Sequence, residues 1–165
     1  MPIHMQNNLP KAKQRAVKIR ALKKTARTIL GALGCPDAEL SILLTGDAQI
    51  AELNTMWRGK EGPTDVLSFS QIETPDGRQR LLQPQGYAGP LGDVVISVET
   101  AERQAHGAEA SLDAELERLL VHGVLHLLGH DHVHGGRQAA RMQAEEHRLL
   151  DAIRARSDAA GASSA

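Results

Sequence analysis

Three histidines, His122, His126 and His132, constrain the fold of this chain more than any other feature. Residues 122 and 126 are four apart in the sequence, so on a helix they share one face and lie about 6 Å apart along its axis. Gly129 can end that helix, because glycine adopts the left-handed conformation that a helix end often needs. A turn at this point would bring His132 back over the same face. The segment therefore predicts a helix and a turn that direct three imidazoles at one point.

Three neutral imidazoles suit a zinc ion, whose bonds to histidine nitrogens are roughly 2.0–2.1 Å long. A site with only three protein ligands keeps a fourth position for water, which is typical of catalytic zinc. The spacing also matches the frame of the long zinc-peptidase motif. That motif places a glutamate base directly after its first histidine, where this chain has Gly123. The pattern predicts one zinc ion per chain, in a hydrolase that is not a peptidase.

Neighbouring side chains leave two features of this site open. His134 is an alternative to His132 as the third ligand, whereas His130 directly follows Gly129 and is too close to fold back. Asp131 is either a carboxylate that orients a ligand imidazole or a simple turn carboxylate.

The length of 165 residues indicates a single domain with a sizeable core, which we expect to span residues 1–156. The polar residues 157–165 are expected to form a disordered tail. Cys35 is the single cysteine, so an internal disulfide is excluded and a reducing compartment is favoured. The chain has no apolar run near the roughly 20 residues of a membrane span and no secretory signal at its N-terminus. We therefore expect a cytoplasmic protein without a membrane partner.

Charge is unevenly distributed along the chain. An apolar stripe predicts a helix over residues 10–33, which Gly34 and Pro36 would end. Residues 1–36 contain no acidic residue and eight of the 19 basic ones: Lys11, Lys13, Arg15, Lys18, Arg20, Lys23, Lys24 and Arg27. Such a basic helix is typical of a surface that binds phosphate backbones, and a merely solvated face is the alternative.

The remaining hydrophobic pattern predicts an α+β fold, with a small mixed β-sheet packed with about five helices. Strands are expected at residues 39–45, 64–70 and 91–98. Helices are expected at 48–57, capped by Asp47 and burying Trp57, at 99–106, at 112–129, capped by Ser111, and at 137–156. Residues 71–90 are expected to form a long surface loop or an irregular hairpin, which could cover a substrate.

Two further motifs precede the histidine cluster. They are Asn54-x-x-Trp57-Arg58-Gly59 followed by Pro63-Thr64-Asp65-Val66-Leu67-Ser68-Phe69, and Leu91-Gly92-Asp93-Val94-Val95-Ile96-Ser97. Together with residues 122–132 they make the chain resemble the YbeY family over residues 40–150. His130 stands where such sequences commonly have an aromatic residue, and Ser70 stands where they commonly have proline.

The resemblance implies a single-zinc endoribonuclease that cuts single-stranded RNA. Family members act in ribosomal RNA maturation, chiefly near the 3′ end of the small-subunit rRNA, and in ribosome quality control. His122, His126 and His132 would be the zinc ligands, and Arg58 would be a functional residue of the same cleft. The implied partners are RNA, the small ribosomal subunit, and a ribosome-assembly GTPase or a ribosomal protein.

The chemistry of Arg58 agrees with this implication, because a guanidinium can hold two phosphate oxygens as charge builds on them. The alternative is a helix-end arginine that binds local carbonyls. Asp65 could hold a loop amide or pair with Arg58, and the sequence offers no clear general base. A zinc-dependent endoribonuclease is the main expectation. A non-catalytic RNA-binding factor with structural zinc and a peptidase-like zinc hydrolase are the alternatives.

Overall fold

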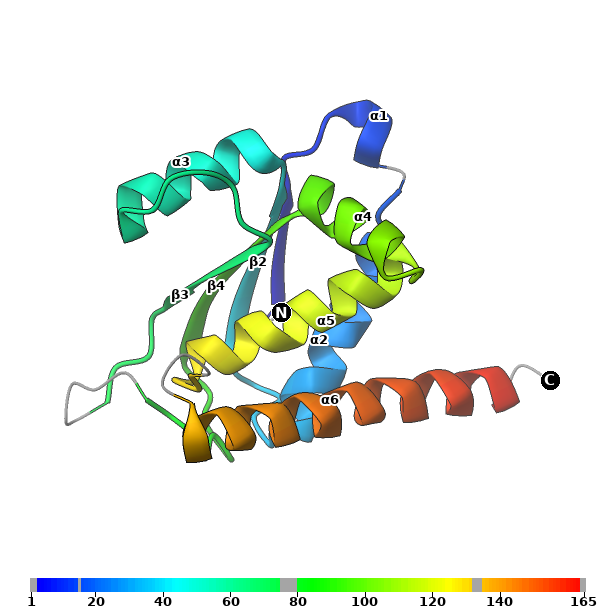
Figure 1. Ribbon diagram of the computed structural model, residues 1–165. Helices are drawn as coiled ribbons and strands as arrows, with labels where there is room; N and C mark the ends of the chain where they lie inside the picture. Colours follow the sequence, from blue (N-terminus) through cyan, green and yellow to red (C-terminus); the bar gives the residue numbers. More distant parts are fainter. Residues whose placement is uncertain (1–2, 15, 75–79, 132–134, 164–165) are drawn as a thin grey trace.

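The computed structural model describes residues 3–14, 16–74, 80–131 and 135–163. These residues form one α+β unit in which a four-stranded sheet packs against helices, as the sequence predicted (Figure 1). The strands are β1 (Ile3–Asn7), β2 (Glu39–Thr45), β3 (Val66–Ser70) and β4 (Pro90–Ser97). The helices are α1 (Lys11–Gln14), α2 (Ile19–Ala32), α3 (Asp47–Arg58), α4 (Val98–Gly107), α5 (Leu112–Leu127) and α6 (Gly136–Ser163).

The strands lie in the order β1-β2-β4-β3. β1, β2 and β4 run parallel, whereas β3 pairs antiparallel with β4 and forms one edge of the sheet. Side chains of a strand alternate between the two faces, and in β2 the buried set is Leu40, Ile42 and Leu44. This alternation gives the sheet one face directed at the main core and a second face that is more open.

Helices α2 and α5 cover the first face, and the long α6 packs against both of them (Figure 1). The core between these layers is aliphatic and includes Leu30, Leu40, Ile96 and Leu120. Helix α3 lies on the second face, where Ile50 forms a smaller cluster with Leu67 and Val95. The sheet therefore separates α5, with its histidines, from the body of α3.

The N-terminal region differs from the prediction in two ways. The expected helix over 10–33 is divided into α1 and α2, because the chain turns near Val17 and buries that side chain at 4% exposure. Strand β1 was missed. Its two apolar residues, Ile3 and Met5, are too few to indicate a strand, and it forms by pairing in parallel with β2.

Helix α3 differs from the predicted helix in two details. Gly46 is the N-cap, and the carboxylate of Asp47 instead accepts hydrogen bonds from the hydroxyls of Ser97 and Thr100, each at 2.6 Å. Trp57, expected to be buried, is 66% exposed. The Trp57 ring packs edge-on against Phe69 of β3, and because β3 is an edge strand, no further strand of the described sheet covers the ring.

The C-terminal helix is longer than predicted. Residues 157–163, expected to belong to a tail, continue α6 as far as Ser163, and residues 164–165 lie outside the described part. Alanine is the strongest helix former, and the segment contains Ala159, Ala160 and Ala162, so its low apolar content does not prevent a helix. No helix within the described ranges combines the length and apolar character needed to cross a membrane.

Candidate active site

Helix α5 presents Arg118, His122 and His126 at intervals of four residues, and therefore on one face. Its N-cap is Ser111, whose hydroxyl accepts a hydrogen bond from the backbone N–H of Ala114 at 3.0 Å, as predicted. The helix ends at Leu127, and Gly129 has a φ of +94°, which confirms the predicted stop. The chain thus leaves α5 one turn beyond the second histidine.

His122 and His126, the two predicted ligands that the structure describes, point at each other. Their Nε2 atoms lie 2.9 Å apart, and their rings meet at 71° with centroids 4.5 Å apart. Two zinc–nitrogen bonds of roughly 2.0–2.1 Å each can easily bridge that separation. The pair therefore fits a single zinc ion held by both Nε2 atoms.

Glu146 on α6 fixes the orientation of the first ring. Its Oε1 lies 2.9 Å from Nδ1 of His122. A proton on Nδ1 is donated to this carboxylate, which leaves the lone pair of Nε2 directed toward His126. Carboxylates commonly orient metal-binding histidines in this way. Glu146 was not predicted from the sequence, and the orienting role of Asp131 stays a prediction.

The predicted third zinc ligand falls outside the described part of the chain. Neither His132 nor its alternative His134 is described, and within the described ranges no three His, Cys, Asp or Glu side chains form a metal site. His130 is buried, with 6% exposure, and burial lowers the pKa of its imidazole.

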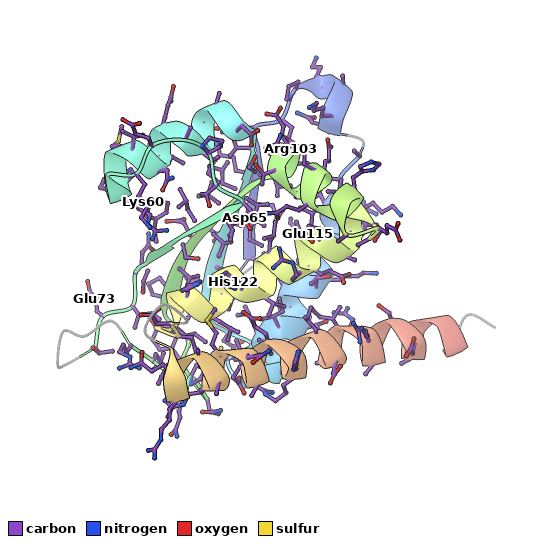
Figure 2. The ribbon with its side chains drawn as sticks, viewed as in Figure 1. Lys60, Asp65, Glu73, Arg103, Glu115 and His122 are labelled. Carbon is purple, nitrogen blue, oxygen red and sulfur yellow. The ribbon has the colours of Figure 1, made fainter. Side chains whose placement is uncertain are left out.

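A cleft of about 650 Å³ opens beside the histidine pair. Figure 2 shows His122 on α5, with Lys60 and Asp65 on the opposite segment between α3 and β3. Arg58, at the end of α3, lines the same cleft. The structure therefore brings Arg58 to the predicted metal ligands although 64 residues separate it from His122 in the sequence. The described residues that line the cleft are Arg58, Lys60, Thr64, Asp65, Val66, Ser68, Arg118, His122 and His126.

Arg118 is a cleft residue that the sequence analysis missed. Its Nε donates to Oε1 of Glu115 at 2.9 Å, and Glu115 is only 6% exposed. The hydrogen bond with Glu115 raises the pKa of the Arg118 guanidinium, and the negative charges of Glu115, Asp65 and Glu146 raise it further. The buried carboxylate thus holds a permanently charged guanidinium one helical turn before His122.

Asp65 is the only carboxylate among the described residues that line the cleft, and both of its oxygens accept hydrogen bonds. Its Oδ1 accepts the backbone N–H of Val66 at 2.8 Å, and its Oδ2 accepts Nε2 of Gln104 at 3.2 Å. Of the two predicted roles, the structure shows the loop-amide contact. Asp65 therefore joins the end of the loop that carries Lys60 to the start of β3 and to α4.

Gly123 has a packing role that the motif alone did not show. A Cβ at this position would lie 2.7 Å from Cγ1 of Val94 and 3.2 Å from Cγ2 of Val66. In addition, the hydroxyl of Ser68 donates to the carbonyl of Gly123 at 2.7 Å. The glycine lets α5 lie close against β3 and β4, and its position faces the sheet.

The sequence contains little that would have identified the two unpredicted site residues, Arg118 and Glu146. Arg118 could have been found from its spacing of four residues before His122, which repeats the spacing to His126. Glu146 could not, because it lies on a separate helix and reaches His122 only through the packing of α6 on α5.

Comparisons with known proteins identify the family of this chain. The family model described as Endoribonuclease YbeY matches residues 5–154. A protein named Endoribonuclease YbeY from Aquifex aeolicus is 43% identical over 145 residues, which cover 88% of this chain and 90% of that protein. One of the same name from Syntrophotalea carbinolica is 42% identical over 153 residues, covering 92% and 95%.

A solved structure supports the fold. The solution structure of a Thermotoga maritima protein aligns with a TM-score of 0.56 at 22% sequence identity and covers 93% of each chain. At this identity the likeness concerns the fold alone. From the family match and the two relatives, the chain belongs to the YbeY family of endoribonucleases.

Proposed function

We propose that this protein is a zinc-dependent endoribonuclease that cuts single-stranded RNA. Its zinc ligands are His122, His126 and His132, and one ion is bound per chain. The observation that carries the proposal is the pair of Nε2 atoms 2.9 Å apart in a cleft lined by three cationic side chains. Membership of an endoribonuclease family supports RNA as the substrate.

The cationic side chains bind the phosphate that is cut. Arg58 donates to two phosphate oxygens, because its planar fork matches them. Lys60 and Arg118 add positive charge on either side, so the cleft favours the extra negative charge of the transition state. Zinc, when bound, lowers the pKa of a coordinated water and polarises a phosphoryl oxygen.

General-base catalysis by a cleft carboxylate is weak in this arrangement. Both oxygens of Asp65 accept hydrogen bonds, and position 123 faces the sheet and has no room for a side chain. We therefore expect slow turnover on short naked RNA. A substrate positioned by the small ribosomal subunit would be cut faster. The RNA would then already be held in the reactive orientation, so the entropic cost of reaching it would not be paid at the cleavage step.

The biological setting is proposed from the family. We place the protein in maturation of the 3′ end of small-subunit rRNA and in ribosome quality control, in the cytoplasm. Its partners there would be the small subunit and a ribosome-assembly GTPase or a ribosomal protein. The exposed basic residues of α2, such as Lys24 and Arg27, are a second candidate RNA contact.

One experiment tests the activity. Wild type, His126→Ala and Arg58→Glu are purified in parallel, their zinc content is measured, and each is incubated with RNA and with casein. Arg154→Glu is the matched control, since its side chain is 78% exposed on α6 and lies outside the cleft lining.

The proposal requires RNA cleavage by wild type and by the control, and its loss in both cleft variants. Zinc should be lost from His126→Ala and retained by Arg58→Glu. Casein cleavage would favour a peptidase-like hydrolase instead. RNA binding without cutting would favour a non-catalytic factor with structural zinc.

A further inference from the structure

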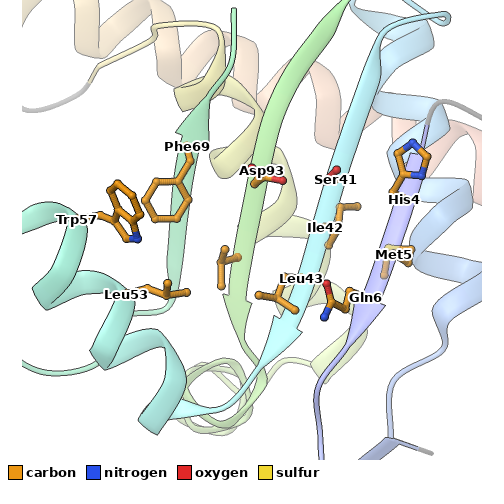
Figure 3. Close-up of a pocket in the computed structure, with 11 residues that line it drawn as sticks. His4, Met5, Gln6, Ser41, Ile42, Leu43, Leu53, Trp57, Phe69 and Asp93 are labelled. Atoms are coloured by element: carbon orange, nitrogen blue, oxygen red, sulfur yellow. The ribbon is translucent and has the colours of Figure 1, made fainter.

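The second face of the sheet carries a groove of about 680 Å³ that the proposed chemistry does not use. Figure 3 shows it running across all four strands beside α3, with Trp57, Leu53 and Phe69 at one end. Leu43 and Val95 continue its apolar floor toward β2 and β4. The groove is therefore a preformed depression with an aromatic end.

The exposed ring of Trp57 is available for contact with a ligand in the groove. Its side chain is 66% exposed, and its ring meets that of Phe69 edge-on, at 68° with centroids 6.3 Å apart. Together with Met56, it is one of the two exposed large hydrophobic residues in the described part of the chain. An exposed aromatic ring at the end of an apolar groove is a common feature of binding sites.

The groove and the cleft share a wall. Trp57 and Arg58 are consecutive residues in the last turn of α3, and Trp57 lines the groove while Arg58 lines the cleft. Edge strand β3 repeats this division, with Ser68 toward the cleft and Phe69 toward the groove. One nucleotide placed at this edge could have its phosphate on one side and its base on the other.

The cleft and the groove also differ in the charge of the residues that line them. Among the described residues, Arg58, Lys60 and Arg118 line the cleft, whereas no lysine or arginine lines the groove. The polar groups that line the groove are His4, Gln6, Ser41 and Asp93. A carboxylate disfavours phosphate there, but hydrogen-bonding side chains around an apolar floor suit a flat ring with polar edges.

We propose that this groove is a subsite for an unpaired nucleobase of the RNA whose phosphate lies in the cleft, with Trp57 stacking on the base. The inference rests on the proposed function and extends it to substrate selection. A base inside a duplex would have to leave its stack to enter the groove, which is energetically unfavourable. The subsite therefore makes the enzyme selective for single strands.

The chain offers a direct probe, because Trp57 is its only tryptophan. Zinc-loaded protein is titrated with a 2′-O-methyl RNA oligonucleotide, single-stranded or paired with its complement, and tryptophan fluorescence and anisotropy are recorded. We expect the single strand to quench Trp57 at the concentrations at which it binds, and the duplex to bind without quenching it.

Variants then test the contact itself. Trp57→Ala should lower affinity for the single strand by about 5- to 150-fold, the range reported for loss of one base stack. Trp57→Phe should restore most of that affinity. Met56→Ala is the matched control, because Met56 is the equally exposed neighbour at 70% and does not line the groove.

Oligonucleotides with one abasic site, moved along the strand, locate the base. Wild type should lose affinity at one or two adjacent positions, and Trp57→Ala should remove that position dependence. Unchanged affinity and profile in Trp57→Ala, while Arg58→Glu still binds RNA weakly, would overturn the subsite and leave the proposed function standing. Absence of RNA binding by wild type would overturn both.

Discussion

Glu146 on α6 holds the ring of His122 on α5, with 2.9 Å between Oε1 and Nδ1. The contact ties the proposed zinc ligand His122 to the C-terminal helix, so the packing of α6 would bear on the proposed metal site. Loss of a carboxylate in this role typically costs 10- to 100-fold in metal affinity.

The first prediction concerns this contact. Glu146→Ala should weaken zinc binding by about 10- to 100-fold, and Glu146→Gln should weaken it less, because the amide oxygen still accepts the Nδ1 proton. Zinc competition with a chromophoric chelator measures the affinity. Asp151→Asn, a 75% exposed change on the same helix, should leave it unchanged. Equal affinities in all four proteins would show that Glu146 does not orient the ligand.

Gly123 should be required for close packing of α5 on the sheet. Gly123→Ala would place a methyl 2.7 Å from Val94 and should lower the free energy of unfolding by about 1–3 kcal/mol. Gly31→Ala in α2 is the matched control, because its new methyl meets nothing within 4 Å. That change should stabilise the protein by about 0.5–1 kcal/mol. Urea unfolding of both variants measures the difference, and a neutral Gly123→Ala would contradict the packing argument.

Arg118 should serve both RNA binding and stability. Arg118→Gln removes one positive charge from the proposed phosphate-binding cleft, so RNA affinity should fall and its salt dependence should flatten by about one phosphate contact. It also leaves Glu115 without its partner, at a cost of about 1–3 kcal/mol in unfolding free energy.

The double variant Glu115→Gln/Arg118→Gln separates the two effects. It should recover stability, because no carboxylate remains unpaired, and it should still bind RNA weakly. Recovery of RNA affinity together with stability would mean that Arg118 acts only on the fold.

Asp47 should make stability depend on pH. Although burial opposes it, hydrogen bonds from Ser97, Thr100 and Arg103 and the charge of Arg103 lower the pKa of Asp47 from its ordinary value of 3.8. A carboxyl with a lowered pKa stabilises the folded state above its ordinary pKa, and this stabilisation is lost as the pH falls through the lowered value.

Asp47→Asn should therefore destabilise the protein at neutral pH by about 1–3 kcal/mol, since hydrogen bonds to a charged group are lost. The gap from wild type should close as the pH falls below 3.8. Unfolding free energies across that range measure it, with exposed Asp151→Asn as the control. A gap independent of pH would show that the charge of Asp47 contributes nothing.

Local patterns were sufficient for much of the fold. The helix stop at Gly129 and the Ser111 cap follow from the conformational preference of one residue and the hydrogen-bonding group of another, and both were confirmed. Strands β2, β3 and β4 were found because their apolar residues are concentrated. Strand β1 was not, since its backbone bonds go to β2, which lies more than 30 residues away in the sequence.

The same division holds for the site. The spacing of His122 and His126 alone predicted that their rings would face each other, because a helix fixes the positions of residues four apart. The contact of Glu146 with His122, the engagement of Asp65 by Gln104, and the exposure of Trp57 depend on how separate elements pack. Only the tertiary structure decided these contacts, because each joins a side chain to the surface of another turn, strand or helix whose position no local preference specifies.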